Sequence, residues 1–398
     1  MHPQPHPPWL FTPLMPINER PARLFVRGEG AWLWDEAGRA YLDWLQGWAV
    51  NALGHCPPTI AGALQAQAAR LITPSPAVHN EPALLLAARL CELGGFHQAF
   101  FGSTGAEANE AAIKLARKWG QVKKQGAFEI VTFHNAFHGR NLATMAASGK
   151  PGWDALFAPA MPGFKKATLN DLDSVLAVLG EKTVAVMLEP VQGEAGVRPA
   201  GRHFLQALRD LCDERGLLLI FDEVQTGCGR LGEVFGFQHF GVKPDIMTLG
   251  KGLGGGVPLS AVLAQQHCCV FEHGDQGGTY AGNPLMCAVG LAVMDVTSHP
   301  DFLARVRVQG ERLRLGLQDV AARHGLGEVR GAGLLLALEL GADRARQVVA
   351  ACHERGLLVN AARAHCLRFM PRLNGTSEEI DTGLQRLDAA LGEVLGGR

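Results

Sequence analysis

The chain has 398 residues, of which 47% are hydrophobic and 19% are charged, and its formal net charge is -1 at pH 7. These values are typical of a soluble protein large enough for two domains, and they exclude the strongly basic character of nucleic-acid and membrane-surface binders. The nine cysteines include one adjacent pair, Cys268 and Cys269, so neither a disulfide framework nor a zinc site is indicated. We expect a cytoplasmic protein that acts on small molecules.

The N-terminal segment, residues 1–16, is rich in Pro and His and lacks the basic start and apolar run of a signal peptide. We expect it to form a surface arm. The next pattern is a hairpin over Ala31–Asp43, in which two strand-like runs, 31–34 and 39–42, flank the turn residues 35–38. No later stretch has the length and apolar character of a membrane span.

From about Glu81 the chain alternates helical patterns with short apolar runs, which indicates an α/β domain with a mainly parallel sheet. The runs are Ala99–Phe101, Glu129–Phe133, Thr183–Leu188, Leu217–Phe221 and Ile246–Leu249. After residue 284 the pattern changes to long amphipathic helices such as Asp301–His324, interleaved with strand-like Leu334–Leu340 and Leu367–Met370. We expect an arm and hairpin over 1–50 that joins a smaller C-terminal α+β domain over 285–398, and a large α/β domain over 51–284.

The strongest local signal is the segment Asp245–Ser260, a buried strand that ends at Lys251 among glycines. Lysine is rarely buried, and apolar surroundings lower its pKa, so a lysine at a strand end can attack a carbonyl carbon and form a Schiff base. The alternative is a surface lysine in a glycine-rich turn, which is common. The surrounding residues must decide between the two.

The same segment also permits a nicotinamide-dependent oxidoreductase, because Gly250, Gly252 and Gly255 have the G-x-G-x-x-G spacing of a dinucleotide fingerprint. A helix should follow such a fingerprint, whereas residues 257–264 have the pattern of a strand. A lysine also stands between the first two glycines. The spacing alone is therefore a weak signal.

Two other predicted strands end in carboxylates, because Asp222 follows Leu217–Phe221 and Glu189 follows Thr183–Leu188. Ligands of α/β sheets bind at strand ends. If Lys251 binds pyridoxal phosphate, the pyridinium nitrogen needs an acid partner, since protonation makes the ring an electron sink. Asp222 is the candidate for that partner. A lone aspartate could instead cap the helix that follows.

A phosphate site is predicted where the run ending at Phe101 meets the helix Ala106–Trp119, because the residues between them are small. Free backbone N–H groups and the helix dipole favour an anion there, and Ser103 or Thr104 can add a hydroxyl. The alternative is that these residues only cap the helix.

Residues 133–140 include Phe137, whose ring could stack on a planar cofactor, and Arg140, which is suited to bind a carboxylate. His134 and His138 have i, i+4 spacing, but no further ligands accompany them, so structural histidines are predicted and no metal site. A second arginine, Arg368, lies on a strand-like run near the C-terminus.

Together these segments resemble the class III aminotransferases, and the resemblance extends over nearly the whole chain. The matching motifs, in order, are Val26–Gly30, Ala49–Asn51, Leu53–Cys56, Ser103–Glu110, Phe137–Arg140, Glu189–Glu194, Asp222–Gln225, Lys251 and Thr279–Pro284. So many ordered motifs are specific to the family. The resemblance implies the type I pyridoxal-phosphate fold, an α/β fold with a mainly parallel seven-stranded sheet, and a homodimer whose two active sites lie at the subunit interface.

The resemblance also implies roles in the cofactor site. Lys251 would be the Schiff-base lysine and proton shuttle, and Asp222 would pair with the pyridinium nitrogen. Gln225 would support the ring oxygen and Phe137 would stack on the ring, with Glu189 close by. The phosphate would be bound by Thr104, Gly105 and Ala106, together with Thr279 of the partner subunit.

For the substrate, the resemblance places Arg368 on the α-carboxylate and Arg140 at a distal contact. Glu194 would be the family's switch residue, which pairs with the α-carboxylate arginine while an ω-amino group reacts and releases it for 2-oxoglutarate or glutamate. Ornithine aminotransferases tend to have a tyrosine near Gly47, so its absence favours an acylated donor. We expect ping-pong transfer from N-acetylornithine to 2-oxoglutarate in arginine biosynthesis, with ornithine, succinyl-diaminopimelate and 4-aminobutyrate as alternative donors.

Overall fold

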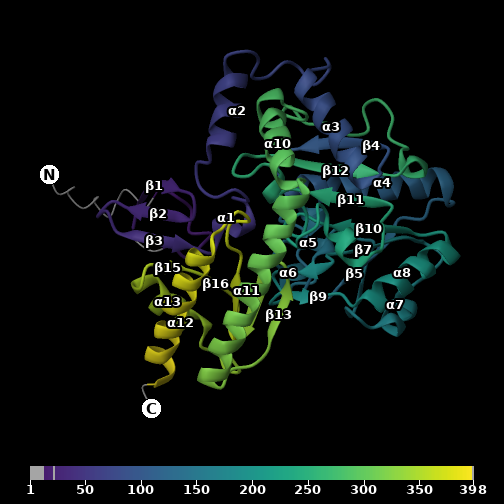
Figure 1. The fold of residues 1–398 in the computed structure, drawn as a ribbon. Helices are drawn as coiled ribbons and strands as arrows, with labels where there is room; N and C mark the ends of the chain where they lie inside the picture. Colours follow the sequence, from purple (N-terminus) through teal and green to yellow (C-terminus); the bar gives the residue numbers. More distant parts are fainter. Residues whose placement is uncertain (1–12, 21–22, 397–398) are drawn as a thin grey trace.

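The computed structural model describes residues 13–20 and 23–396. Its centre is a seven-stranded sheet in which every strand except β12 points in the same direction (Figure 1). The order across the sheet is β4 (Gln98–Gly102), β12 (Ser260–Ala264), β11 (Ile246–Leu249), β10 (Leu218–Asp222), β7 (Thr183–Leu188), β5 (Glu129–Phe133) and β6 (Phe164–Ala167). The predicted α/β fold with a mainly parallel seven-stranded sheet is confirmed.

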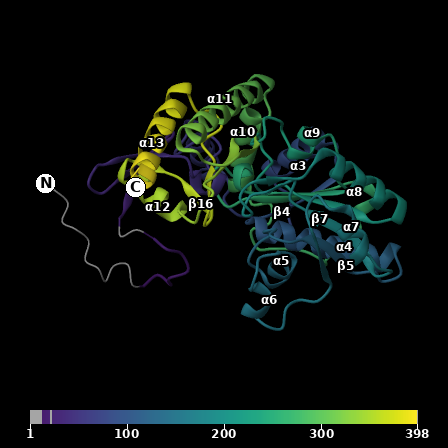
Figure 2. The same ribbon diagram turned by 90° about the horizontal axis from the view of Figure 1, so that it is seen from below.

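Helices cover both faces of this sheet, as the continuous apolar strands predict. Along β10, Leu219 and Phe221 belong to one hydrophobic cluster, while Leu218 and Ile220 belong to another on the opposite face. Figure 2 shows the two helical layers. One layer contains α3 (Glu81–Gly94), α7 (Leu172–Val178) and α8 (Arg202–Arg215), and the other contains α4 (Gly105–Lys123) and α5 (Leu142–Ala147).

The predicted strands agree closely with the observed ones. β5, β7 and β11 have the predicted bounds, β10 is shifted by one residue so that it ends at Asp222, and β4 is longer by one residue at each end. The strand predicted over 257–264 begins only at Ser260, so the prediction is wrong for residues 257–259. β6 was not predicted, because an edge strand needs fewer apolar residues and its sequence is Phe-Lys-Lys-Ala.

A second hydrophobic core lies between two four-stranded sheets and the C-terminal helices. One sheet has the order β1 (Phe25–Glu29), β2 (Trp32–Asp35), β3 (Ala40–Asp43), β15 (Leu357–Leu358), and the other β13 (Val329–Ala332), β14 (Leu335–Glu339), β17 (Cys366–Phe369), β16 (Asn360–Arg363). The helices are α10 (Pro284–Thr297), α11 (Pro300–His324), α12 (Ala345–Glu354) and α13 (Ser377–Gly396). The predicted hairpin is confirmed, with both strands, β2 and β3, shifted by one residue toward the C-terminus. β3 also pairs in parallel with β15.

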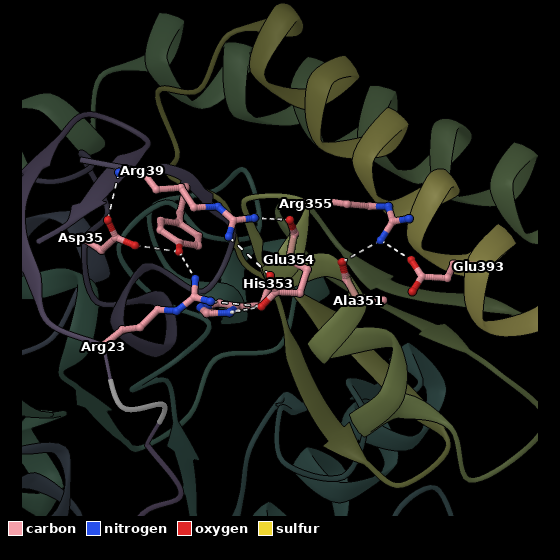
Figure 3. A network of polar contacts seen from close by, with 9 residues as sticks. Arg23, Asp35, Arg39, Ala351, His353, Glu354, Arg355 and Glu393 are labelled. Atoms are coloured by element: carbon pink, nitrogen blue, oxygen red, sulfur yellow. Dashed lines mark hydrogen bonds and ion pairs between the residues drawn. The ribbon is translucent and has the colours of Figure 1, made fainter. Parts of the chain in front are cut away.

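Polar contacts reinforce the junction between this hairpin and α12 (Figure 3). Arg23 and Arg39 both pair with Glu354, at nitrogen to oxygen distances of 3.2 and 3.4 Å. The ring of Tyr41 stacks on His353 with 5.0 Å between the centroids. Exposed ion pairs stabilise a fold by at most about 1 kcal/mol each, so the fully buried Tyr41 contributes more to this junction than the arginines.

The remaining elements are short connections. They are α1 (Gln46–Ala49), α2 (Pro58–Ala68), α6 (Trp153–Leu156), β8 (Val191–Gln192), β9 (Arg198–Pro199), α9 (Gly236–Phe240), η2 (Lys251–Leu253) and η3 (Gln266–Cys268). None of the described helices combines the length and hydropathy of a membrane span. Most of the predicted N-terminal arm lies outside the described residues, and the predicted domain boundaries stay predictions.

Gly383 on α13 tests how tightly the second core is packed. A Cβ added there would lie 2.0 Å from Cζ2 of Trp44, which is buried. We expect Gly383→Ala to lower the free energy of unfolding by about 1–3 kcal/mol, because the indole has no space to move. Gly392→Ala on the same helix is the control, since its Cβ would meet only His324 at 3.9 Å. Urea unfolding followed by circular dichroism measures both, and equal losses would contradict the packing argument.

Candidate active site

Lys251 begins η2 directly after β11 and Gly250. Its φ is +40°, a left-handed conformation that non-glycine residues rarely adopt. A Cβ on Gly250 would lie 3.4 Å from Cα of Gly105, so the start of α4 lies against this turn. Strained backbone persists only where the surrounding structure enforces it, and such positions cluster at functional sites. The lysine therefore lies at a constrained strand end beside the predicted phosphate loop.

Ionisable groups from other segments surround Lys251. Burial lowers the pKa of its ammonium group, and the charge of Arg368 lowers it further, whereas Asp222, Glu194 and Glu189 oppose the shift. The net pKa lies below that of an ordinary lysine. A lowered pKa increases the neutral fraction, which is the form that acts as nucleophile and base. This environment favours the reactive lysine over the alternative of a surface lysine.

Asp222 is held in one orientation by partners from three places in the chain. Its Oδ2 accepts a hydrogen bond from Nδ2 of Asn109 at 2.7 Å and lies 2.8 Å from Nδ1 of His138. Its Oδ1 accepts from the amide of Val224 at 3.1 Å, and Thr248 Oγ1 donates to Oδ1 of Asn109 at 2.7 Å. The residue is 4% exposed. The predicted strand-end acid is thus a buried and rigidly placed carboxylate.

The contacts of His138 and Asn109 were not predicted. The sequence favoured a structural histidine, and the structure adds that His138 is fully buried against Asp222, with no partner for its Nε2 among the described residues. A signal did exist in the pattern. Asn109 and Thr248 are polar positions within an otherwise apolar helix face and strand, and buried polar groups require partners.

Glu189 follows β7 and binds the backbone of two loops. Its Oε1 accepts from the amide of Phe137 at 2.8 Å, and its Oε2 accepts from the amide of Gly193 at 3.3 Å. Burial, reinforced by the charge of Asp222, raises the pKa of Glu189 to about 8. Glu189 therefore positions both the loop that presents Phe137 and the turn that leads to Glu194.

The start of α4 combines the two alternatives proposed for it. Thr104 caps the helix, because its Oγ1 accepts from the amide of Glu107 at 3.2 Å. The carboxylate of Glu107 accepts in turn from the amides of Ser103 and Thr104, at 2.5 and 3.1 Å. The amides of Gly105 and Ala106 have no intrahelical acceptor, since they belong to the first turn. These two amides and the helix dipole remain available for an anion.

Arg368 reaches the site from β17. Its Nη2 lies 2.8 Å from Oε1 of Glu194, and Oδ1 of Asn360 accepts from its Nε and Nη2 at 3.0 and 2.7 Å. The arginine is fully buried, and its Nη1 has no partner within 13–20 and 23–396. Burial acts to raise the pKa of Glu194, but the pairing with Arg368 outweighs it and the pKa is lowered. Glu194 is therefore ionised and bound to Arg368.

Gln225 lies in the same corner of the site. Its Nε2 donates to Sδ of Met370 at 3.7 Å. A Cβ on Gly193 would lie 1.7 Å from Oε1 of Gln225 and 3.3 Å from Nη1 of Arg368. A side chain at position 193 would displace the amide of Gln225, so the chain before Glu194 passes directly over Gln225 and Arg368.

Within the described part of the chain, two further predicted residues, Arg140 and Thr279, are not bonded to this cluster, whereas Gly47 lies beside it. Arg140 is exposed, and its guanidinium lies 6.0 Å from the ring centre of Trp153, a residue that was not predicted. Thr279 is in an exposed loop, and none of the described hydrogen bonds links it to the cluster. Gly47 lies in α1, which packs against η2 and in which all four residues have positive φ.

With this geometry established, the comparisons define the class of protein. The sequence model of the class-III aminotransferases matches residues 15–391, so the chain belongs to this family. Acetylornithine aminotransferase 2 of Bordetella bronchiseptica is 56% identical over 384 residues, which cover 96% of this chain and 97% of that protein. Acetylornithine aminotransferase of Ralstonia nicotianae is 55% identical, with 95% and 96% covered.

Solved structures agree with the family. The N-acetylornithine aminotransferase of Stenotrophomonas maltophilia has a TM-score of 0.83 and 36% identity, and 94% of this chain and 97% of that chain are covered. The ornithine aminotransferase of Toxoplasma gondii has a TM-score of 0.93 and 31% identity, with 98% and 95% covered.

Pyridoxal phosphate is the cofactor of the family, and the residues present fit it. They offer a buried amine at Lys251, a fixed carboxylate at Asp222, an aromatic ring at Phe137 and free amides at the start of α4. The oxidoreductase alternative is wrong, because the chain belongs to the aminotransferase family. The α-helix that should follow a dinucleotide fingerprint is also missing, since the short turn η2 and the strand β12 follow Gly250.

Glu189 provides a pH test of this buried site. Because its pKa rises from 4.5 to about 8 on folding, the folded state binds more protons than the unfolded state between these values, and the free energy of unfolding falls as pH rises. Glu189→Gln removes this titration. The free energy of unfolding is measured by urea titration between about pH 5 and 8 and plotted against pH. The slope for Glu189→Gln should be shallower than that of the wild type, by an amount that corresponds to at most about one bound proton. Glu378→Gln, at an exposed position on α13, should keep the wild-type slope. An unchanged slope in Glu189→Gln would refute the assigned pKa.

Proposed function

We propose that this aminotransferase transfers the ω-amino group of N-acetylornithine to 2-oxoglutarate, as a cytoplasmic enzyme of arginine biosynthesis. The observation that supports the donor most strongly is the 55–56% identity to relatives named acetylornithine aminotransferase, over at least 95% of the chain. The ion pair between Glu194 and Arg368 supports the pairing of an ω-amino donor with an α-keto acid.

Pyridoxal phosphate, when bound, supplies a carbonyl carbon that accepts amines and a protonated ring that withdraws electrons from the adjacent carbon. Lys251 would hold the cofactor through Nζ, and Asp222 would face its ring nitrogen. Phe137 would cover the ring, and Gln225 would donate to its oxygen. The phosphate is assigned to the hydroxyl of Thr104 and the amides of Gly105 and Ala106.

Proton transfer is assigned to Lys251. Its lowered pKa increases the fraction of neutral amine, the form in which Nζ can take up a proton from the substrate carbon. The nearby carboxylates of Asp222 and Glu194 then stabilise the ammonium form. Asn109 holds Asp222 in one position, so this carboxylate is fixed while the lysine changes its charge.

Glu194 and Arg368 would decide which end of a substrate is bound. While they pair, the charge of Arg368 is neutralised and a donor enters with its ω-amino group first. The α-carboxylate of 2-oxoglutarate or glutamate replaces Glu194, because a guanidinium binds a carboxylate through two parallel hydrogen bonds. The Glu194 side chain is 37% exposed and can move into solvent, whereas Asn360 keeps Arg368 in place.

The choice of an acylated donor depends on the region of Gly47. This glycine has no side chain, its φ of 62° disfavours other residues, and its helix packs against η2. We propose that the missing side chain leaves room for an acyl group. Ornithine, succinyl-diaminopimelate and 4-aminobutyrate are the alternative donors, because the same arginines and glutamate would serve each of them.

We further propose a homodimer with active sites at its interface. Large apolar side chains that are 42% to 64% exposed lie on α3, on the loop before it and on the loop before α10: Leu71, Ile72, Val78, Leu84, Leu85 and Tyr280. Exposed apolar surface of this extent is typical of an interaction site. Nδ2 of Asn80 donates to the carbonyl of Gly282 at 2.9 Å, so the loop that contains Thr279 adjoins this surface. Thr279 of the partner subunit could then reach the phosphate.

The donor is tested by kcat/KM for N-acetylornithine, ornithine, succinyl-diaminopimelate and 4-aminobutyrate, with 2-oxoglutarate as acceptor. We expect N-acetylornithine to exceed ornithine by about tenfold or more, since a pocket shaped for an acyl group discriminates by this amount. Lys251→Ala should lose turnover with every donor, together with the yellow absorption that borohydride bleaches. Lys243→Ala, at an exposed lysine that binds the carbonyl of Gly95, is its control. Preference for free ornithine would contradict the proposed donor, and a colourless wild type would contradict the cofactor.

The dimer is tested by Leu84→Arg, which places a charge in the proposed interface. Sedimentation velocity should show a monomer at micromolar concentration, because an unpaired buried charge costs several kcal/mol. The monomer should also retain less cofactor, since it lacks Thr279 of the partner subunit. Leu315→Arg, at a leucine 49% exposed on α11, is the matched control and should leave the assembly unchanged. A monomeric wild type would contradict the proposal.

A further inference from the structure

Two cations lie on one indole ring beside the active site. The guanidinium of Arg140 is 6.0 Å from the ring centre of Trp153, and Nζ of Lys150 is 5.1 Å from the same centre. Both cations are exposed, and neither forms an ion pair with a carboxylate in the part of the chain that the structure describes. An exposed cation without a carboxylate partner is available to bind an anion, and both cations lie around the same indole.

A short turn builds this arrangement. The sequence Lys150-Pro151-Gly152-Trp153 has proline and glycine at the central positions that a type II β-turn prefers. Gly152 has φ 82° and ψ -7°, and the amide of Trp153 donates to the carbonyl of Lys150 at 3.3 Å. The turn therefore brings the first and fourth residues together, so that the ammonium group lies over the indole.

The turn is anchored to the loop that follows β5. The amide of Gly149 donates to the carbonyl of Ala136 at 3.0 Å, and the amide of Asn135 donates to the carbonyl of Gly149 at 2.9 Å. A Cβ on Gly149 would lie 2.2 Å from the carbonyl oxygen of Phe133, so only glycine permits this approach. Lys150 is thus fixed beside the strand end from which Phe137 is presented.

The same cluster borders the groups that select the substrate. Trp153 contacts Phe137 edge-on, with 5.7 Å between the ring centroids. Lys150 is one of the cations that lower the pKa of Glu194, after Arg368 and Lys251. The two cations therefore lie beside the loop that presents Phe137, and Lys150 is near enough to Glu194 for its charge to act on that carboxylate.

The geometry points to Lys150 as a specificity residue that works with Arg140 to bind the carboxylate at the far end of the substrate, while Trp153 packs against its aliphatic chain. This inference rests on the proposed function. It restricts the substrates to amines and keto acids that have a carboxylate remote from the reacting carbon. An arginine offers a planar fork and a lysine a compact point charge, and both groups bind carboxylates.

The test compares Lys150→Gln with wild type on two amines that differ only in a carboxylate, N-acetylornithine and N-acetylputrescine. We expect kcat/KM for N-acetylornithine to fall about tenfold, because a hydrogen bond to a charged group is lost, and kcat/KM for N-acetylputrescine to change less than about twofold. Lys150→Arg should recover most of the loss. Lys182→Gln removes a lysine that lies 6.0 Å from the ring of Phe128, away from the site, and should affect neither amine.

Inhibition by glutarate and by butyrate gives a second measurement that needs no turnover of either amine. Lys150→Gln should weaken the dicarboxylate glutarate about tenfold and leave the monocarboxylate butyrate unchanged. Equal losses for both members of either pair would mean that Lys150 only supports the fold of the loop, and no loss would mean that it binds no substrate; each result overturns the inference. A wild-type enzyme that does not use N-acetylornithine would instead contradict the proposed function.

Discussion

The buried carboxylate of Asp222 is the constraint on which the rest of the active site depends. A carboxyl group with 4% exposure is tolerated only if its oxygens are paired, and its partners come from α4, from the loop after β5 and from the turn after β10. Satisfying one carboxylate thus aligns three separate strand ends. Glu189 extends the same arrangement by binding the amides of Phe137 and Gly193. The positions of the aromatic ring and of the switch residue follow from these bonds.

A second constraint joins the two hydrophobic cores. Arg368 is fully buried on β17, and Asn360 on β16 and Glu194 beside β8 are its polar partners. A buried charge that loses its partner is strongly destabilising, so the departure of Glu194 requires another anion to replace it. This requirement couples substrate binding to the motion of a single side chain. It also explains why the ion pair lies between segments from different sheets, where one partner can be rigid and the other partly exposed.

Local preference and function compete at several positions of the site. Lys251 has a positive φ, and the whole turn Gln46–Ala49 is left-handed, although isolated chains avoid both conformations. At the start of α4, Glu107 accepts from the amides of Ser103 and Thr104, which leaves only the next two amides for an anion. The same short segment therefore stabilises a helix and prepares a phosphate site. Such conflicts between local rules and the final structure are expected where chemistry takes place.

The sequence by itself determined the sheet and the identity of its strand-end residues, because strands buried on both faces require continuous apolar runs and the family motifs are read in order along the chain. It assigned Lys251, Asp222, Glu194 and Arg368 without any distance between them. Only the tertiary structure decided that Asn109 binds Asp222 across 113 residues, that Asn360 holds Arg368, and that Lys150 and Arg140 share the ring of Trp153. The physical reason is that a local pattern records which face of an element is buried, whereas the partner of a buried polar group depends on how distant elements pack.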